Sequence, residues 1–224
     1  MNPQTMAEAE RLFISVKNGI KNIKNVEVVI CPPFVYLSAL LNPKSYILNP
    51  KIGAQDSFWE NPPTGGGAFT GEVSPKMLRN VGCRYVIIGH SERRRYLNET
   101  DEMVNKKLKA ALKNDLKPVL CIENISQVKK GLKGILKEGL KNMVIAYEPV
   151  FAIGTGKPCS PEKAEKMRKA IKSAINTDIP ILYGGSVNSQ NAGDYIEKAK
   201  FQGLLVGGAS LNPQEFLRIV QNID

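Results

Sequence analysis

A regular alternation of short apolar runs with helix-like segments constrains the fold of this chain more than any other feature of its sequence. The apolar runs predict seven strands, at residues 26–31, 51–55, 85–89, 118–122, 143–147, 181–183 and 204–206. Helix-spaced apolar residues and N-cap signals predict eight helices, at residues 5–20, 35–41, 75–82, 104–112, 126–140, 161–175, 191–198 and from 213 onward. Strands that are apolar on both faces are typical of a parallel sheet covered by helices.

This alternation predicts an α/β protein with (β/α)₈ barrel architecture, in a single domain over residues 1–224. The barrel is one strand short, because no strand precedes the first helix. Several candidate site residues come at the ends of strands: His90, Glu148, Ser186 and Gly207. Active sites of such barrels are built where the strands end. A doubly wound open sheet is the alternative, but no G-x-G-x-x-G segment follows a strand.

The chain is basic. Its 31 Lys and Arg residues against 21 Asp and Glu give a net charge of +10, which suits nucleic acid, an anionic membrane surface or phosphorylated small substrates. Part of the excess falls on one predicted helix, which carries Lys129, Lys130, Lys133, Lys137 and Lys141. These lysines are interpreted as a solvated face, so neither nucleic acid nor a membrane is expected as a partner.

Cysteine spacing and the lack of long apolar runs indicate the cellular setting. Cysteines occur at four widely spaced positions without a C-x-x-C pair: Cys31, Cys83, Cys121 and Cys159. Neither a disulfide framework nor a zinc site is therefore predicted. No run approaches the roughly 18 apolar residues of a membrane span, and no signal-peptide core is found near the start. We expect a cytoplasmic protein.

The stretch from Ala146 to Lys157 places an acid at the end of a strand. The strand runs directly into Glu148, and Pro149 ends it because proline cannot donate to a β-ladder. Two glycines follow at 154 and 156, where the backbone can adopt positive φ and approach a ligand closely. The pattern predicts a base beside a hinged lid, and the alternative is an acidic strand end followed by an ordinary glycine turn.

His90 is the only histidine of the chain and follows a predicted strand. A single histidine at a strand end is often structural, but this one is followed by Ser91 and Glu92, and Glu148 lies at an equivalent strand end. Abstraction of a proton next to a carbonyl needs a carboxylate in a dry pocket, where desolvation raises its pKa toward the working range. We therefore expect His90 and Glu148 to act together.

Five motifs resemble, in order, those of the triosephosphate isomerase family over nearly the whole chain. They are GAFTGE (67–72), GHSERR (89–94), AYEPV-AIGTGK around Glu148, YGGSV (183–187) and VGGASL (206–211). The resemblance implies an isomerase of glycolysis and gluconeogenesis that interconverts dihydroxyacetone phosphate and D-glyceraldehyde 3-phosphate through an enediolate. It implies neither a metal nor a cofactor.

The resemblance also implies roles for single residues. Glu148 would move a proton between C1 and C2, and His90 would be the neutral imidazole that polarises the carbonyl, both being the family's own known roles. Supporting residues would be Ser91 and Glu92. The substrate phosphate would bind at Gly154, Ser186, Gly207 and Gly208. The lid would comprise Pro149, Val150, Phe151, Ala152, Ile153, Thr155, Gly156 and Lys157.

A homodimer is also implied, because in the family one loop reaches into the partner subunit. Its residues here would be Phe69, Thr70, Gly71 and Glu72. Mere flexibility of the glycine run at 65–67 is the alternative interpretation of this loop.

The chain departs from the family pattern at its beginning. Family members begin with an apolar strand that ends in N-x-K-M-N, and this chain begins at what corresponds to its last two residues, Met1-Asn2. The missing asparagine and electrophilic lysine imply impaired activity, because loss of one oxyanion donor costs on the order of a hundred to a thousandfold in rate. A misplaced start and a real truncation both stay open. Phe151 also replaces the tryptophan usual in the lid.

Two other functions stay open. An aldolase or synthase of barrel fold would need a lysine at a strand end for Schiff-base chemistry, and the predicted strand ends show none. A catalytically inactive barrel that binds phosphorylated ligands or polyanions would use the basic surface, and salt-sensitive binding to nucleic acid would favour it.

Overall fold

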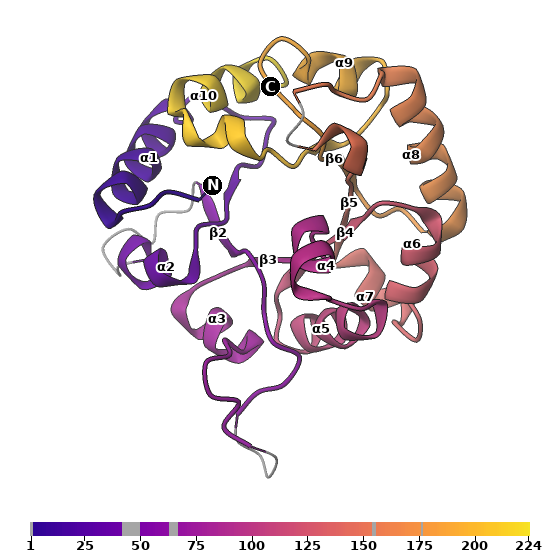
Figure 1. Ribbon diagram of the computed structural model, residues 1–224. Helices are drawn as coiled ribbons and strands as arrows, with labels where there is room; N and C mark the ends of the chain where they lie inside the picture. The colour runs from indigo at the N-terminus through magenta and orange to yellow at the C-terminus, as the bar shows by residue number, and fades with distance from the viewer. Residues whose placement is uncertain (1, 42–49, 63–66, 154–155, 176) are drawn as a thin grey trace.

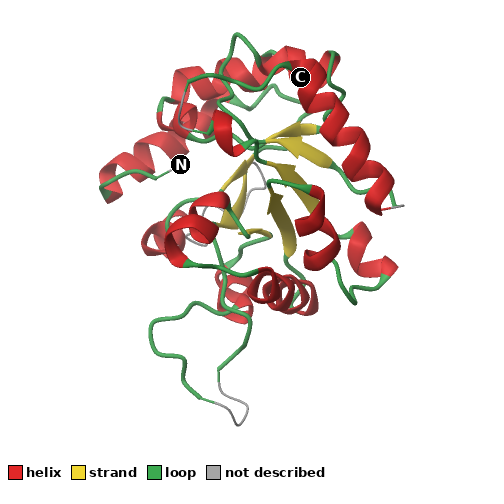
Figure 2. Cartoon of the chain, turned by 45° about the vertical axis from the view of Figure 1, so that its right-hand side comes forward, coloured by secondary structure: helices red, strands yellow, loops and turns green. Residues whose placement is uncertain are grey.

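The computed structural model describes residues 2–41, 50–62, 67–153, 156–175 and 177–224. A parallel sheet of seven strands runs in chain order from β1 to β7, and helices surround it (Figures 1 and 2). The strands are β1 (Val29–Ile30), β2 (Lys51–Ala54), β3 (Tyr85–Ile88), β4 (Lys117–Ile122), β5 (Val144–Tyr147), β6 (Ile181–Tyr183) and β7 (Gly203–Leu204). This is the predicted (β/α)₈ architecture with seven strands.

The seven predicted strands are confirmed, and the largest differences lie at the two ends of the sheet. The run predicted at 26–31 forms a ladder only over Val29–Ile30, and the run predicted at 204–206 forms one over Gly203–Leu204. Both are edge strands of the order β1 to β7, so each has a ladder on one side. Pairing on one side supports fewer ladder residues than pairing on two.

The helices are α1 (Met6–Gly19), α2 (Phe34–Leu40), α3 (Pro75–Val81), α4 (Ser91–Leu97), α5 (Asp101–Lys113), α6 (Ile125–Gly131), α7 (Lys137–Lys141), α8 (Pro161–Ile175), α9 (Ala192–Glu197) and α10 (Pro213–Gln221). Two details differ from the eight expected. Helix α4 was not predicted, and the helix expected at 126–140 is divided into α6 and α7. The division includes Gly134, whose φ of 70° is incompatible with a continuous right-handed helix.

Side-chain caps begin several helices, as their sequences predict. Thr5 accepts from the Glu8 N–H at 3.2 Å at the start of α1, and Ser74 accepts from the Met77 N–H at 3.2 Å at the start of α3. At the start of α1 the Glu8 carboxylate also accepts from the Gln4 N–H at 2.9 Å, so a second backbone N–H ahead of the helix is bound by a side chain.

The sheet is buried on both faces, as its apolar strands predict. Alternate strand residues face opposite sides. One set packs against the helices in the main core, including Val86, Ile88 and Leu120. The other set forms a second cluster from strand residues alone, built on Tyr85, Val119, Cys121, Val144 and Ala146. The curled sheet therefore encloses its own apolar interior.

The outer layer of helices continues from the end of the chain back to its beginning. Helix α10 lies beside α1 (Figure 1), and a methyl group at Gly19 would lie 2.4 Å from the side chain of Leu217. The Asp224 carboxylate accepts from the N–H groups of Lys24 and Asn25 at 3.2 and 2.8 Å. This contact joins the last residue of the chain to the segment between α1 and β1. Across the described residues, every helix is too short or too polar to cross a membrane.

Candidate active site

His90 lies where β3 passes into α4 and is the N-cap residue of that helix. The turn is made by Gly89, whose φ of 75° suits glycine. The imidazole Nδ1 accepts from the backbone N–H of Glu92 at 3.3 Å, so a neutral His90 carries its proton on Nε2. The Glu92 carboxylate lies 3.8 Å from Nδ1 on a largely exposed side chain. The fold thus fixes which nitrogen of His90 can donate.

Glu148 follows β5 and meets His90 directly. Since alternate residues share a face, Glu148 continues the inward face of Val144 and Ala146. Its side chain is 2% exposed, and Oε1 lies 3.0 Å from Nε2 of His90. Its Oε2 accepts from the backbone N–H of Ser91 at 2.9 Å. The predicted proximity of histidine and acid is therefore present, with both carboxylate oxygens held by the β3–α4 junction.

Burial and charge act on the site in opposite directions. Burial lowers the pKa of His90, but the hydrogen bond with Glu148 and the negative charge of Glu148 raise it, and the net pKa lies above the ordinary value. Burial also raises the pKa of the Cys121 thiol, which touches the Glu148 carboxylate. Cys121 was not predicted as a site residue. It comes from the inner face of β4, which only the sheet register identifies.

The predicted lid segment begins with a 3₁₀ turn, η2 (Val150–Ala152), directly after Pro149. The Phe151 ring is 55% exposed, and Nζ of Lys163 lies 4.3 Å from its centroid. The Ser186 hydroxyl donates to the Ala152 carbonyl and ties this turn to the segment after β6. Ile153, Gly156 and Lys157 flank the predicted residues Gly154 and Thr155, which lie outside the described part of the chain.

The far end of the same segment is held by two tyrosines. The Cys159 N–H donates to Tyr183 Oη at 3.1 Å, and Tyr195 Oη donates to the Cys159 carbonyl at 2.5 Å. The two tyrosine rings are stacked 3.7 Å apart. Neither tyrosine was predicted as a site residue, although Tyr183 begins the YGGSV motif. Both ends of the lid segment are therefore attached to the region around β6.

Two glycines of the YGGSV motif allow the chain to pass close to the acid. A methyl group at Gly184 would lie 3.4 Å from Cγ of Glu148, and one at Gly185 would lie 2.7 Å from Cγ of Pro149. The second distance is too short for any side chain. These glycines are required by packing against the site and were not among the predicted site residues.

The predicted phosphate-binding residues follow two neighbouring strands. Ser186 has a φ of 49° and comes three residues after β6, while Gly207 and Gly208 come shortly after β7, which pairs with β6. A methyl group at Gly207 or Gly208 would meet nothing within 4 Å. The space on the Cβ side of both glycines is open, which leaves room for a ligand.

The predicted dimer loop lies in a segment that projects from the barrel (Figure 1). Its base is joined by a hydrogen bond from the Phe58 N–H to the Val73 carbonyl at 2.8 Å. The predicted residues lie beyond this base: Phe69, Thr70, Gly71 and Glu72. Phe69 packs on Phe58 with ring centroids 4.8 Å apart, and the other three are exposed. Within the chain, Glu72 of this loop lines a pocket together with Arg93 and Leu97 of α4.

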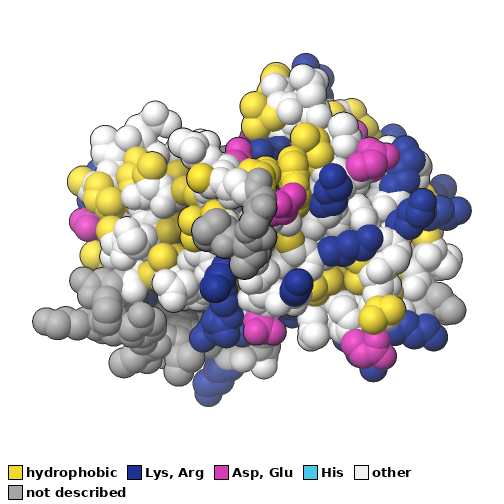
Figure 3. Space-filling view, turned by 90° about the horizontal axis from the view of Figure 1, so that it is seen from below, with side chains coloured by type: hydrophobic (Ala, Val, Ile, Leu, Met, Phe, Trp, Pro, Cys, Tyr) yellow, Lys and Arg dark blue, Asp and Glu magenta, His cyan; other side chains and the backbone are white. Residues whose placement is uncertain are grey.

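Within the part of the chain that is described, no three His, Cys, Asp or Glu side chains group as metal ligands. Figure 3 shows Lys and Arg side chains spread over one face with Asp and Glu among them. The arrangement at His90 and Glu148 can abstract a proton with a carboxylate and donate a hydrogen bond from an imidazole.

Comparison with known proteins gives a consistent result. The family profile described as triosephosphate isomerase matches residues 1–223. A triosephosphate isomerase of Dictyoglomus turgidum is 43% identical over 98% of this chain and 95% of that protein. Similar proteins of the same name come from Lactobacillus delbrueckii subsp. bulgaricus, 43% identical over 100% of this chain and 94% of that protein, and from Caldanaerobacter subterraneus subsp. tengcongensis, 43% identical over 97% and 94%.

Proposed function

The chain belongs to the triosephosphate isomerase family, and we propose that Glu148 and His90 carry out the family's reaction in it. That reaction interconverts dihydroxyacetone phosphate and D-glyceraldehyde 3-phosphate. One observation carries the assignment of the two residues. A buried carboxylate and an imidazole with a defined donor nitrogen meet at 3.0 Å at the ends of β5 and β3.

The proposed mechanism starts by separating this pair. Substrate enters between Glu148 and His90, the carboxylate takes a proton from the carbon next to the carbonyl, and Nε2–H donates to the carbonyl oxygen as negative charge develops there. The proton of the neighbouring hydroxyl group moves to the former carbonyl oxygen by way of Nε2 of His90, and Glu148 returns the carbon-bound proton to the other carbon, so that the carbonyl and the hydroxyl exchange places. Because Nδ1 accepts from the Glu92 N–H at 3.3 Å, the helix terminus favours a neutral imidazole once the carboxylate has turned to the substrate.

Binding and protection of the substrate are proposed for the loops after β5, β6 and β7. Ser186, Gly207 and Gly208 supply a hydroxyl and N–H groups for the phosphate, and Gly154 completes the set. Residues 149–157 cover the site and exclude water, which stabilises an enediolate against loss of its phosphate. The hydrogen bonds of Ala152 and Cys159 to the β6 region support this role, since they attach the cover near its start and the chain just beyond its end.

We propose a homodimer joined through the projecting segment 57–73. The exposure of Thr70, Gly71 and Glu72 supports this, and so does the exposure of two large apolar side chains on α4, Tyr96 and Leu97, at 67% and 60%. Replacement of Thr70 by Arg should yield monomers, measured by light scattering. A Thr70→Arg protein of unchanged mass would contradict the proposed interface.

We also propose one domain over residues 1–224 and a cytoplasmic location. The continuous sheet from β1 to β7 supports the single domain. Four free cysteine thiols suit a reducing compartment.

The catalytic assignment is tested by isomerase assays of Glu148→Gln and His90→Gln, with Glu165→Gln as a matched control. Glu165 pairs with Lys169 on the outside of α8, so its loss should leave the rate unchanged. The two site variants should lose about 10²- to 10⁴-fold in kcat. Each variant is made in the 224-residue chain and in one with an added N-terminal strand ending in Asn-Trp-Lys.

Retention of activity by Glu148→Gln in either background would overturn the assignment. A different result is that the 224-residue chain and the extended chain both lack isomerase activity and still bind a carboxylate analogue of the enediolate. In that case the catalytically inactive barrel that binds phosphorylated ligands becomes the better account. Salt-sensitive binding of nucleic acid by the folded chain would favour an inactive barrel that binds polyanions.

A further inference from the structure

Helix α4 makes both contacts that define the site, although it has only seven residues (Ser91–Leu97). Its first turn supplies the Ser91 N–H to Glu148 and the Glu92 N–H to His90. A helix of this length is not stable on its own in water. The position of its first turn must therefore be fixed by contacts that other parts of the chain make with the helix.

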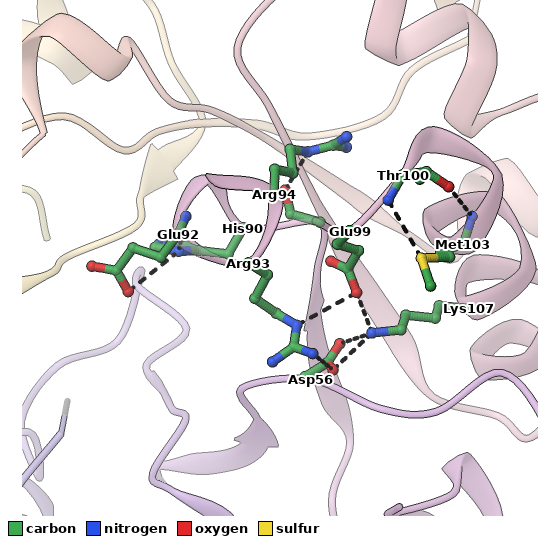
Figure 4. A network of polar contacts seen from close by, with 10 residues as sticks. Asp56, His90, Glu92, Arg93, Arg94, Glu99, Thr100, Met103 and Lys107 are labelled. Carbon is green, nitrogen blue, oxygen red and sulfur yellow. Dashed lines mark hydrogen bonds and ion pairs between the residues drawn. The ribbon is translucent and has the colours of Figure 1, made fainter. Parts of the chain in front are cut away.

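One such contact is a buried cluster of charges below the helix, drawn in Figure 4. Nη2 of Arg93 lies 2.8 Å from Oδ2 of Asp56, which follows β2. Nζ of Lys107 on α5 donates to both oxygens of Asp56, at 2.8 and 2.7 Å, and also to Glu99. Asp56, Glu99 and Lys107 are 6%, 7% and 3% exposed. The cluster balances two carboxylates against two cations and joins α4 to β2 and α5.

The next residue holds the helix from its other side. Nε of Arg94 donates to the Gly89 carbonyl at 2.7 Å, and Nη1 donates to Asp101 at 2.8 Å. A methyl group at Gly89 would lie 2.8 Å from Nη2 of Arg94. Arg94 therefore fixes the turn that precedes His90, whereas Arg93 fixes the helix that follows it.

We propose that Asp56, acting through Arg93, is a positioning residue that sets α4 and with it the tautomer of His90 and the placing of the Glu148 carboxylate. The inference rests on the proposed function of that pair. Asp56 touches neither of them. Its carboxylate contacts Arg93 of α4 and Lys107 of α5, and its loss changes the balance of forces on α4.

The cluster also indicates the direction of that change. Oε2 of Glu99 is buried and has no hydrogen-bond partner among the described residues. The Nε of Arg93 already lies 3.4 Å from the other oxygen of Glu99. When the charge of Asp56 is removed, Glu99 is the remaining carboxylate for both cations, and Arg93 turns toward it. The helix shifts rather than unfolds, because the guanidinium keeps a buried partner.

The test uses Asp56→Asn, which keeps the shape of the side chain and removes its charge. Because the chain has a single histidine, nitrogen NMR of the imidazole reports His90 without ambiguity. It is recorded at a pH above the titration of the ring. Asp194→Asn is the matched control, since it removes an exposed ion pair with Lys198 on α9. Arg93→Lys is the second variant, which keeps the charge and loses the guanidinium that contacts Asp56 through Nη2 and Glu99 through Nε.

In the wild type and in Asp194→Asn, the ring should show one tautomer, with Nε2 protonated and Nδ1 not. Asp56→Asn and Arg93→Lys should show a mixture of tautomers, faster exchange of the Nε2 proton, and a loss in kcat of about tenfold with KM nearly unchanged. If Asp56→Asn fails to fold, the imidazole signals and kcat of Arg93→Lys test the inference instead.

A folded variant with wild-type imidazole signals and wild-type kcat would overturn the inference, because the cluster would then be structural only. That result leaves the proposed function intact as long as His90→Gln and Glu148→Gln are inactive. If those two variants keep their activity, it is the proposed function that fails.

Discussion

A methyl group on Gly185 would lie 2.7 Å from Cγ of Pro149, so the turn after β6 and the residue after the buried acid are in direct contact. Pro149 follows Glu148 immediately. A displacement of either turn is therefore passed to the carboxylate, which connects the YGGSV motif to the proposed base without a hydrogen bond between them.

Gly185→Ala should lower kcat of the isomerase by at least tenfold, because the added methyl group must displace the proline ring or Tyr183 Oη, which lies 2.8 Å away. Steady-state kinetics measures this. Gly193→Ala is the control, since a methyl group there meets nothing within 4 Å and the residue lies within α9. It should keep full activity and gain up to about 1 kcal/mol of stability. Equal activity of both variants would contradict the argument.

Tyr183→Phe should destabilise the fold by about 1–3 kcal/mol, because it leaves the buried N–H of Cys159 without its acceptor. Urea unfolding measures the change. Tyr36→Phe, at a half-buried tyrosine on α2, should change the free energy of unfolding by less than about 0.5 kcal/mol. A Tyr183→Phe protein as stable as the control would show that another group accepts from Cys159.

The stability contributed by His90 should depend on pH in a defined direction. Its pKa in the folded chain is raised above the ordinary value of about 6.5, so the folded state binds the proton more tightly than the unfolded state. The stability difference between wild type and His90→Gln should be fully present below about pH 6.5 and disappear as pH rises through the folded pKa. Chemical unfolding across this range tests it, and a difference that grows with pH would contradict the His90–Glu148 contact.

Lys107→Met should cost about 3–5 kcal/mol of stability, because Asp56 and Glu99 then stay buried with only Arg93 to balance them. Lys129→Met, which removes an exposed lysine of α6, should cost less than about 0.5 kcal/mol. Thermal or urea unfolding distinguishes the two. A small loss for Lys107→Met would indicate that water enters the cluster.

An added N-terminal strand that ends in Asn-Trp-Lys should raise isomerase activity by about a hundredfold or more. It would pair with the edge strands β1 and β7 and bring an ammonium group to the ends of the strands, where His90 and Glu148 lie. A variant ending in Asn-Trp-Met should keep the added strand and lose most of the gain. Equal activity of the original and extended chains would show that another group already acts as the electrophile.

Local sequence patterns predicted much of this protein. Apolar runs located all seven strands, and N-cap signals marked where helices begin, as the structure shows at Ser74 and Asn212. Glu148 and His90 were predicted as a pair because each follows a strand, and parallel strands end at the same edge of a sheet. These features depend on residues close together in the chain, which is why a single sequence contains them.

Other features depended on contacts between distant residues. Helix α4 lacks an apolar period and is held by Arg93 and Arg94, whose partners include Asp56, far away in the sequence. No local pattern marks such a helix. The position of Cys121 against Glu148 follows from the register of β4 and β5.

Residue spacing was sufficient to predict the order of strands and helices and the two residues proposed for proton transfer, because hydrophobic periodicity and strand ends are properties of neighbouring residues. How those two residues are held depends on contacts that form only in the folded chain. Packing around Gly185, the buried charges at Asp56 and the hydrogen bond of Glu92 to His90 set their geometry. The physical reason is that hydrogen-bond direction and van der Waals contact are fixed by distances of a few ångströms between atoms, which spacing along a chain does not specify.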